Sequence, residues 1–326
     1  MKAVRFHELG GPEVLRFEEL ADPVPGPGEL LLKVEAAGLN FSDIAKRTGR
    51  YLEPTPLPFT PGSEAAGTVV AVGAGVSRFA VGDRATGIFP DRSGGYAELA
   101  VMPEAQAVAI PAGLTATLAV AVPNQGATAM SLLTLMARLA PGESVLVSAA
   151  AGGVGGWLVA LARALDAGRI VALASSEAKR AETLRLGADV AIDPADPDWP
   201  AQARAATGGR GVDVFVDSVG GAVFRGGMSA LAPFGRAIVY GLASGERVDV
   251  APVTLMRSCQ SVGGFHLDTV MADPPRMRTM LDDLFARVAR GEITPRIDRV
   301  FALSEAVEAQ TWLGSRQAMG KIVITP

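Results

Sequence analysis

A run of small residues near the middle of the chain constrains the fold more than any other feature. Residues 145–157 read VLVSAAAGGVGGW, an apolar segment that passes through glycines into a helical pattern. Ala150, Gly152 and Gly155 fill the three small positions of the G-x-G-x-x-G pattern, with alanine at the first. Small residues let a pyrophosphate approach the backbone, and the N–H groups and positive end of the following helix hold its charge. The phosphate contacts predicted from this turn are Ala151, Gly152, Gly153 and Val154.

The flanking segments strengthen this interpretation. An apolar strand precedes the glycines, an amphipathic helix is predicted over 155–165, and a second apolar strand over 170–174. A strand, turn, helix and strand in this order are what the dinucleotide-binding pattern requires. The alternative is a glycine-rich turn that binds nothing, and this context disfavours it.

The end of the second strand indicates which dinucleotide is bound. NAD sites usually carry Asp or Glu about 20 residues after the glycines, where it binds the ribose 2′-hydroxyl. Ser175 holds that place here, and Ser176 and Lys179 follow it. Hydroxyls and a cation suit a 2′-phosphate, so NADPH is favoured over NADH. Against this, Glu177 is close by, and Lys179 with Arg180 could be only the solvated face of a helix.

Length and composition bound the class of protein. The 326 residues are 49% hydrophobic and 20% charged, which fits about two globular domains. A formal net charge of −4 argues against a nucleic-acid or anionic membrane surface as the main interaction. The single cysteine, Cys259, excludes an internal disulfide and any multi-cysteine zinc site, and is consistent with a reducing compartment. Because the sequence shows neither a signal peptide nor a long apolar segment, we expect a cytoplasmic protein that does not bind membranes.

The chain divides into two parts of different texture. Residues 1 to about 110 are rich in Gly and Pro, with short alternating segments typical of a small β-barrel over 29–35, 67–72 and 96–101. After Pro123, strands and helices alternate, and nearly continuous apolar strands predict a parallel sheet buried on both faces. The remaining predicted elements are strands over 190–192, 212–217, 237–240 and 321–325, and helices over 177–186, 221–231, 277–290 and 304–313.

Motifs outside the glycine-rich run extend the analysis to the whole chain. Together with residues 149–156, they are 38–43 (GLNFSD), 61–67 (PGSEAAG), 81–84 (VGDR) with 94–98 (GGYAE), and 315–321 (SRQAMGK). In these motifs the sequence resembles the medium-chain dehydrogenase/reductase superfamily, specifically its zinc-independent quinone oxidoreductase branch, which includes the zeta-crystallins. The resemblance implies an α/β fold in which a GroES-like β-barrel catalytic domain comprises residues 1–123 and 266–326. A Rossmann NADP-binding domain, a doubly wound parallel sheet, is implied at 124–265, with the active site in the cleft.

The motifs that hold catalytic zinc in other relatives lack its ligands here. Zinc-dependent relatives carry Cys in the first motif and His-Glu in the second, where this chain has Asn40, Ser63 and Glu64. One carboxylate cannot form the tetrahedral site that Zn²⁺ needs. The cysteine-rich lobe that binds structural zinc in those relatives is missing before Gly94, and both histidines of the chain are isolated in the sequence. We therefore expect chemistry without a metal.

Without a Lewis acid, the expected hydride acceptor is one that spreads its own negative charge. Quinones and α,β-unsaturated carbonyls do this, and the resemblance implies their reduction by NADPH. Asn40 could hydrogen-bond the substrate carbonyl or the cofactor ribose, and Tyr51 could donate a proton or hydrogen bond to the developing oxyanion. Structural alternatives stay open for both. Asn40, with Asp43, could cap the helix predicted over 42–47, and Tyr51 could anchor the proline-rich loop that follows it.

The resemblance implies further cofactor contacts, position by position. Thr128 corresponds to a hydroxyl that faces the nicotinamide ribose, and Arg316 to an arginine that reaches the cofactor phosphate. One departure concerns the adenosine side, because several relatives carry Tyr after the third strand where this chain has Pro194. The backbone that flanks the nicotinamide is implied at Gly241, Leu242, Phe265, His266 and Leu267.

The implied partners are a small-molecule substrate and a second copy of the chain. A homodimer would form through the last edge strand of the Rossmann domain, within 258–265, because an unpaired apolar edge is a liability. Two other functions stay open. One is an enoyl-thioester reductase acting on acyl carriers, and the other is a crystallin-like protein that binds NADPH without turnover. Some zeta-crystallins bind RNA, but this sequence lacks the clustered Lys and Arg that RNA binding requires.

Overall fold

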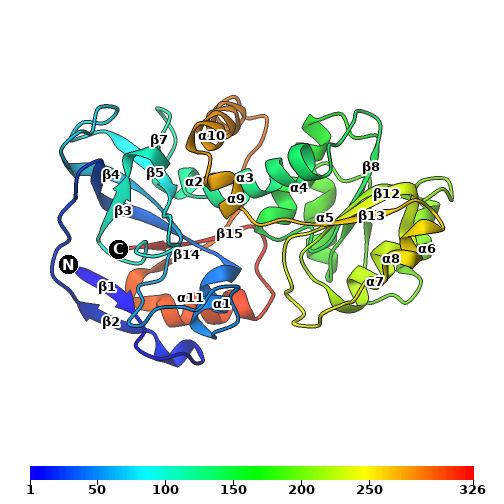
Figure 1. Ribbon diagram of the computed structural model, residues 1–326, viewed down its shortest axis with the longest axis horizontal. Helices are drawn as coiled ribbons and strands as arrows, with labels where there is room; N and C mark the ends of the chain where they lie inside the picture. The colour runs from blue at the N-terminus through cyan, green and yellow to red at the C-terminus, as the bar shows by residue number, and fades with distance from the viewer. The chain divides into compact units, whose positions relative to one another are not determined.

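The structure is a computed structural model that describes all 326 residues, and its internal contacts divide the chain into two units (Figure 1). The terminal unit comprises Met1–Ala127 with Asp268–Pro326, and the central unit comprises Thr128–Leu267. The sequence prediction placed the two crossings between the units a few residues earlier, at 123–124 and 265–266. Helix α3 (Pro123–Ser131) runs through the first crossing, so no loop marks the boundary there.

The central unit is built on a parallel sheet with strand order β10-β9-β8-β11-β12-β13. Counted along the unit, this order is 3-2-1-4-5-6, the Rossmann arrangement, so the predicted fold class is confirmed here. The strands are β8 (Ser144–Val147), β9 (Arg169–Leu173), β10 (Val190–Ile192), β11 (Val212–Asp217), β12 (Leu231–Val239) and β13 (Ser261–Gly264). The helices are α4 (Gly153–Ala164), α5 (Glu177–Arg185), α6 (Trp199–Ala205), α7 (Gly221–Ala230) and α8 (Pro252–Met256).

Burial explains why the apolar runs of the sequence form this sheet. Val145, Leu146 and Val147 of β8 have no exposed surface. Ile170 and Val171 of the neighbouring β9 are equally buried. Inner strands of a parallel sheet that is covered on both faces require continuous apolar runs of this kind, which is why both strands were predicted from hydrophobicity alone.

Strand β12 is longer than predicted, because the chain bulges within it. The sequence pattern placed a strand over 237–240, whereas the observed strand begins at Leu231. Phe234 adopts a left-handed backbone (φ 62°), and the pairing register with β11 shifts between Val212 and Val214. A bulge breaks the hydrophobic alternation by which a strand is recognised in a sequence.

The terminal unit is built on a mostly antiparallel sheet whose strands pair in the order β14-β15-β3-β4-β5-β7, with β6 also paired to β3 and with β1 and β2 in a separate pair. Its strands are β1 (Lys2–Arg5), β2 (Arg16–Glu19), β3 (Glu29–Leu39), β4 (Glu64–Val72), β5 (Arg84–Ile88), β6 (Leu99–Pro103), β7 (Ala107–Ala109), β14 (Ile297–Ala302) and β15 (Lys321–Thr325). Its other helices are α1 (Phe41–Arg47), α2 (Ala116–Ala119), α9 (Asp268–Met271), α10 (Pro274–Ala289) and α11 (Ala306–Gly314).

The long strand β3 sets the geometry that matters for the site, because its end lies between two other strands. Ile322 of β15 is opposite Leu39, and Ala65 of β4 is opposite Ala37. The first residues of β15 and β4 and the residue after β3 therefore meet at one end of three adjacent strands. Strand β15 follows β3 and β4 by hundreds of residues in the sequence, so only the sheet register brings these three strand ends together.

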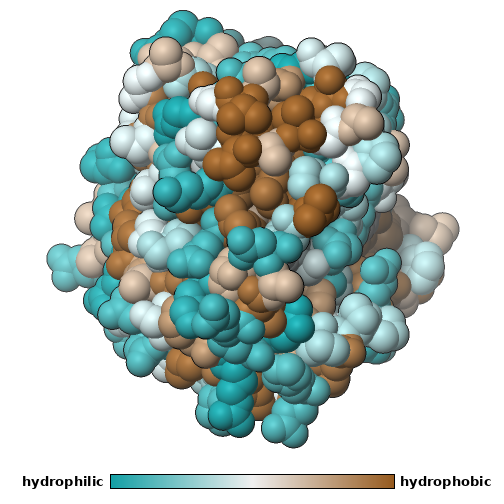
Figure 2. All heavy atoms as spheres, turned by 90° about the vertical axis from the view of Figure 1, so that its left-hand side faces the viewer, coloured by the Kyte–Doolittle hydropathy of each residue, from teal (hydrophilic) through white to brown (hydrophobic).

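The surface offers less direct guidance. Figure 2 shows one face of the molecule, on which a patch of hydrophobic residues is bordered by hydrophilic ones. Patches of a few hundred Å² are common on folded proteins, so this one does not by itself identify a function. No helix combines the length and the apolar composition that are needed to cross a bilayer.

Candidate active site

The glycine-rich turn lies at the carboxyl end of β8, where the strand order of the central sheet reverses. β8 pairs with β9 on one side and with β11 on the other, and open α/β sheets bind ligands at such a switch point. Ala149 has a left-handed backbone (φ 46°), so the tight turn falls one residue before Ala150, which fills the first position of the pattern. A Cβ on Gly155 would lie 2.3 Å from the carbonyl oxygen of Ala149. Close packing of helix on turn therefore requires glycine at the third position.

The first turn of α4 presents backbone donors. The helix begins at Gly153, and its N-cap Gly152 has no side chain that could satisfy them. The first N–H groups of a helix have no acceptor inside the helix, so those of Gly153 and Val154 are available to an anion. The N–H of Gly152 instead donates to the carbonyl of Ala149 over 2.9 Å. Of the predicted phosphate contacts, Gly152 thus supplies close approach, and the two residues after it supply donors.

The predicted 2′-phosphate residues lie at the end of β9 and the start of α5. Ser175 and Ser176 are exposed, and Ser176 caps α5 by accepting a hydrogen bond from the N–H of Lys179 over 3.3 Å. Arg180 donates to the Asp193 carboxylate (2.8 Å) and to a backbone carbonyl (3.2 Å). Arg180 is thus engaged in holding the fold, and Lys179, the predicted phosphate ligand, lies in the first turn of α5.

The residues implied to flank the nicotinamide lie at the same carboxyl edge of the central sheet. Gly241 and Leu242 follow β12, and the N–H of Phe265, just after β13, donates to the carbonyl of Val239 over 2.9 Å. This bond aligns the ends of the two strands. His266 and Leu267 continue from Phe265, and Thr128 is a buried residue of α3.

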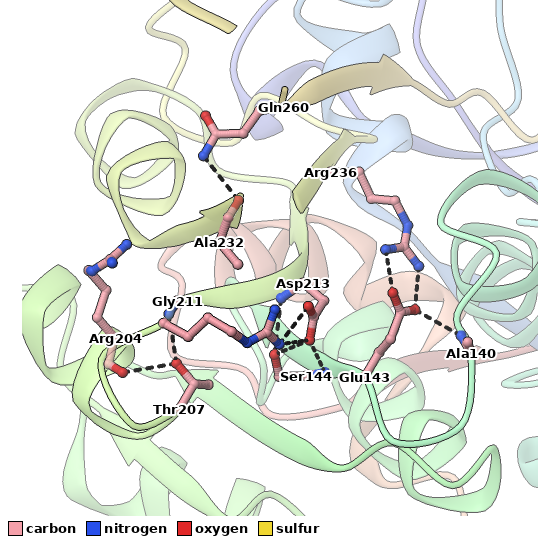
Figure 3. A network of polar contacts seen from close by, with 11 residues as sticks. Ala140, Glu143, Ser144, Arg204, Thr207, Gly211, Asp213, Ala232, Arg236 and Gln260 are labelled. Atoms are coloured by element: carbon pink, nitrogen blue, oxygen red, sulfur yellow. Dashed lines mark hydrogen bonds and ion pairs between the residues drawn. The ribbon is translucent and has the colours of Figure 1, made fainter. Parts of the chain in front are cut away.

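The opposite, amino-terminal edge of the sheet is also polar, but its groups serve the fold (Figure 3). Arg236 binds both carboxylate oxygens of Glu143 (2.8 and 2.6 Å), and these bonds lower the pKa of Glu143. Asp213 accepts from the N–H and the hydroxyl of Ser144 (2.8 and 2.7 Å) and from Arg210 (2.7 Å). The contact between Ser144 and Asp213 ties the starts of the neighbouring strands β8 and β11 together, and the dashed lines of Figure 3 mark this contact and the pair of Arg236 and Glu143.

In the terminal unit, Asn40 meets two buried charged residues. Its amide nitrogen donates to the Glu64 carboxylate (2.9 Å), and its amide oxygen accepts from the Lys321 ammonium (2.9 Å). Lys321 and Glu64 also form a direct ion pair, and neither side chain has any exposed surface. Asn40 is the N-cap residue of α1, but the cap bond that closes this turn runs from its N–H to the Asp43 carboxylate (2.8 Å). The amide of Asn40 is thus committed to the ion pair.

The Glu64 carboxylate extends this network toward the ends of the terminal unit. Its second oxygen accepts from the N–H of Asn124 over 2.9 Å. The Asn124 side chain accepts from Arg92 over 2.7 Å, and Arg92 also pairs with Asp268. Arg92 is buried and has a left-handed backbone (φ 60°), a conformation that non-glycine residues seldom adopt. A continuous polar network thus connects Asn40 with the residues that adjoin both crossings of the chain.

Asp43 is a second buried acid beside this network. Burial raises its pKa to about 6, although its own hydrogen bonds and nearby Lys321 act in the opposite direction. The hydroxyl of Tyr96 donates to its carboxylate over 3.3 Å, and burial raises the pKa of Tyr96 as well. Asp43 fixes the start of α1 and thereby the position of Asn40.

Tyr51 lies in the loop after α1. Its ring stacks under the ammonium of Lys46, 4.5 Å from the ring centroid, and Lys46 also lies 5.2 Å from the ring centroid of Phe59. Burial raises the pKa of Tyr51, so the phenol keeps its proton at neutral pH. Burial also lowers the pKa of Lys46. A protonated phenol is able to act as a hydrogen-bond or proton donor.

Several network residues escape prediction from the sequence. Lys321, Asn124 and Arg92 were not selected as site residues, because each approaches Asn40 or Glu64 only through the fold. One sequence signal was available. Lys321 opens a strand whose next three residues are apolar, and a buried lysine needs an acidic partner. The predicted contact Arg316 lies just after α11, exposed and with a left-handed backbone (φ 60°).

The donors at the positions of catalytic zinc do not suit that ion. Asn40 and Ser63 replace the usual Cys and His, and Glu64 is already paired with an ammonium, which repels a dication. Across the whole structure, no group of three or more His, Cys, Asp or Glu side chains is arranged to hold a metal ion.

Comparisons with known proteins agree across the whole length. Family models described as "Alcohol dehydrogenase GroES-like domain" and "Zinc-binding dehydrogenase" match residues 26–112 and 153–286. A quinone oxidoreductase from Pseudomonas aeruginosa is 36% identical, covering 100% of this chain and 99% of the relative. A 2-haloacrylate reductase from a Burkholderia species is 32% identical, covering 99% and 98%. The structure of Escherichia coli quinone oxidoreductase complexed with NADPH superimposes with a TM-score of 0.94 at 29% identity and covers 100% of both chains. With its two domains and all its motifs, the chain therefore belongs to the quinone oxidoreductase branch of the medium-chain dehydrogenase/reductase superfamily.

Proposed function

We propose that this protein is an NADPH-dependent reductase of quinones or α,β-unsaturated carbonyls that works without a metal. One observation carries the proposal. The chain combines a phosphate-binding turn at the Rossmann switch point with a buried ion pair, Lys321 and Glu64, where zinc-dependent relatives bind their catalytic metal. The family relatives support it, since they include quinone oxidoreductases and a 2-haloacrylate reductase.

The residues of the central unit suit the proposed cofactor. Glycine at 155 permits the close turn, the N–H groups of Gly153 and Val154 at the start of α4 would bind the pyrophosphate, and Lys179 offers a cation near the end of β9. Bound NADPH supplies a hydride from its nicotinamide. The protein has to orient that group and stabilise charge on the acceptor.

The terminal unit supplies two candidate polar groups for this chemistry. Tyr51, whose raised pKa keeps it protonated, would donate a hydrogen bond or a proton to the oxyanion that forms on the acceptor. Asn40 has an amide held by Glu64 and Lys321 and would contact the cofactor ribose. An acceptor that spreads its own negative charge needs no Lewis acid. This fits a site in which the Glu64 carboxylate is already paired with Lys321.

A panel of acceptors tests the proposal. Loss of NADPH absorbance is measured with quinones, 2-alkenals and enoyl thioesters, before and after dialysis against a chelator. We expect turnover with quinones or alkenals that survives the chelator. Turnover restricted to enoyl thioesters would favour the enoyl-thioester reductase, tight NADPH binding without oxidation would favour a binding role, and a required transition metal would overturn the proposal.

The choice of NADPH over NADH has its own test in Lys179→Ala. If Lys179 binds the 2′-phosphate, this substitution raises the KM for NADPH about tenfold or more, since charge-assisted bonds contribute about 1.5–3 kcal/mol. The KM for NADH should stay nearly unchanged. An equal rise in KM for both cofactors would show that Lys179 does not bind the 2′-phosphate.

We further propose a homodimer through β13, the edge strand of the central sheet. Strand β13 pairs with β12 on one side only. Nearby Phe234 on β12 and Val253 and Met256 on α8 are exposed, and a partner chain would cover such apolar groups. Sedimentation at micromolar concentration should give twice the mass of one chain, and a mass of one chain would contradict the dimer.

A further inference from the structure

Nearly all of the hydrogen-bonding capacity of Asn40 is taken by its neighbours. The amide nitrogen donates to Glu64 (2.9 Å) and to the carbonyl of Gly38 (3.4 Å), and the amide oxygen accepts from Lys321 (2.9 Å). A side-chain amide has two N–H donors and one oxygen with two lone pairs. One lone pair of the oxygen is therefore left for a ligand.

The two charged neighbours also determine which way the amide faces. A flipped amide would aim its NH₂ group at the ammonium of Lys321 and its oxygen at the carboxylate of Glu64. Two charge-assisted bonds would then become two repulsive contacts. Asn40 is 7% exposed and both charged side chains have no exposed surface, so water cannot compensate. Opposite charges on its two sides leave the amide a single orientation.

The backbone of β3 makes room for this arrangement. A Cβ on Gly38 would lie 2.4 Å from a carboxylate oxygen of Glu64 and 2.6 Å from Cε of Lys321. Glycine is thus required where the ion pair passes close to the strand.

We propose that Lys321 and Glu64 are positioning residues that hold the amide oxygen of Asn40 toward a ligand hydroxyl. In this role Asn40 accepts a hydrogen bond from a sugar hydroxyl and does not donate one to a substrate carbonyl. The identity of the sugar, the ribose of NADPH, rests on the proposed function. The ion pair acts through Asn40 and touches no reacting atom.

The test is a double-mutant cycle with the NADPH dissociation constant as readout. The E64Q/K321M variant removes both charges but keeps the chain volume, and the glutamine amide can pair with either orientation of Asn40. We expect NADPH to bind about three- to tenfold more weakly, the effect of one neutral hydrogen bond. N40A should lose a similar factor, and the triple variant should bind no more weakly than N40A. E19Q/K2M, which removes the exposed Lys2 and Glu19 pair, is the matched control and should change nothing.

Two outcomes would overturn the proposal: unchanged affinity in E64Q/K321M, or a triple variant whose loss is the product of the two separate losses. If E64Q/K321M does not fold, N40L decides the matter with both charged side chains retained, since leucine is similar in size to asparagine and has no hydrogen-bond acceptor. Its NADPH affinity should fall about three- to tenfold, and an unchanged affinity would refute the acceptor role. If the wild-type protein itself binds no NADPH, the proposed function fails before any variant is compared.

Discussion

The two candidate sites, one in each unit, are built in opposite ways. The turn of the central unit uses backbone groups of consecutive residues, with glycine where a Cβ would strike the Ala149 carbonyl. The cluster of the terminal unit uses side chains of Asn40, Glu64 and Lys321, which three adjacent strands bring together. A site made of backbone groups depends mainly on small residues that let a ligand approach. A site made of buried charged side chains depends on charge balance, so its stability should respond to charge-removing substitutions and to pH, whereas that of the turn should not.

The largest difference should appear when one charge of the buried pair is removed. Lys321→Met leaves the Glu64 carboxylate buried without its cation, and breaking a buried pair in this way costs about 3–5 kcal/mol. The free energy of unfolding, measured by urea titration, should fall by that amount. E64Q/K321M should recover most of it, since no lone charge remains. A loss below about 1 kcal/mol in the single variant would mean that the pair is not buried as described.

The pH dependence of stability should also reside in the side-chain cluster. Burial raises the pKa of Asp43 from 3.8 to about 6, so the folded protein holds this proton more tightly than the unfolded chain. Ionisation therefore costs stability. The contribution of Asp43 is most favourable below pH 4 and falls by on the order of 3 kcal/mol as the pH rises to about 6.

Asp43→Asn isolates this contribution, because asparagine is isosteric and does not titrate. The difference in unfolding free energy between wild type and D43N, measured from pH 4 to pH 7, should shift against the wild type as the pH rises. A difference that is constant with pH, or one that shifts the other way, would contradict the raised pKa.

The backbone site should be sensitive to a single methyl group at one glycine and indifferent to it at the next. Gly155→Ala places a Cβ 2.3 Å from the Ala149 carbonyl oxygen and 2.8 Å from Cα of Ala150, so the turn has to move. We expect NADPH affinity to fall about a hundredfold, which corresponds to about 2.7 kcal/mol. At Gly156 the nearest atom is a flexible leucine methyl 3.4 Å away, so Gly156→Ala is the matched control and should bind normally. Similar losses in both variants would show that the close approach at Gly155 is not what matters.

The smallest effect should come from the hydroxyl of Tyr51. Solvent can deliver the proton in place of the phenol, so Tyr51→Phe should lower kcat by about tenfold or less, well below the loss of about 10²–10⁴ for a general acid. Steady-state kinetics with NADPH and a quinone measure this directly. A thousandfold loss would instead make Tyr51 an essential general acid.

Local patterns accounted for much of the fold. The strands predicted over 190–192, 212–217 and 321–325 match β10, β11 and β15, because a short apolar run marks each of them in the sequence. Exposed or irregular elements were missed or misplaced. Strand β14, with a mixed burial pattern, and helix α6 were not predicted, and the bulge at Phe234 hid the start of β12.

The sequence by itself determined the phosphate-binding turn and the absence of the usual zinc ligands at Asn40 and Ser63, because both depend on residue identity within short motifs. Only the tertiary structure decided what replaces those ligands. Lys321 is 257 residues from Glu64 and 281 from Asn40, and no local pattern links them. The register of β15, β3 and β4 closes that distance, and the cost of burying unpaired charges ensures that the ammonium, the carboxylate and the amide meet.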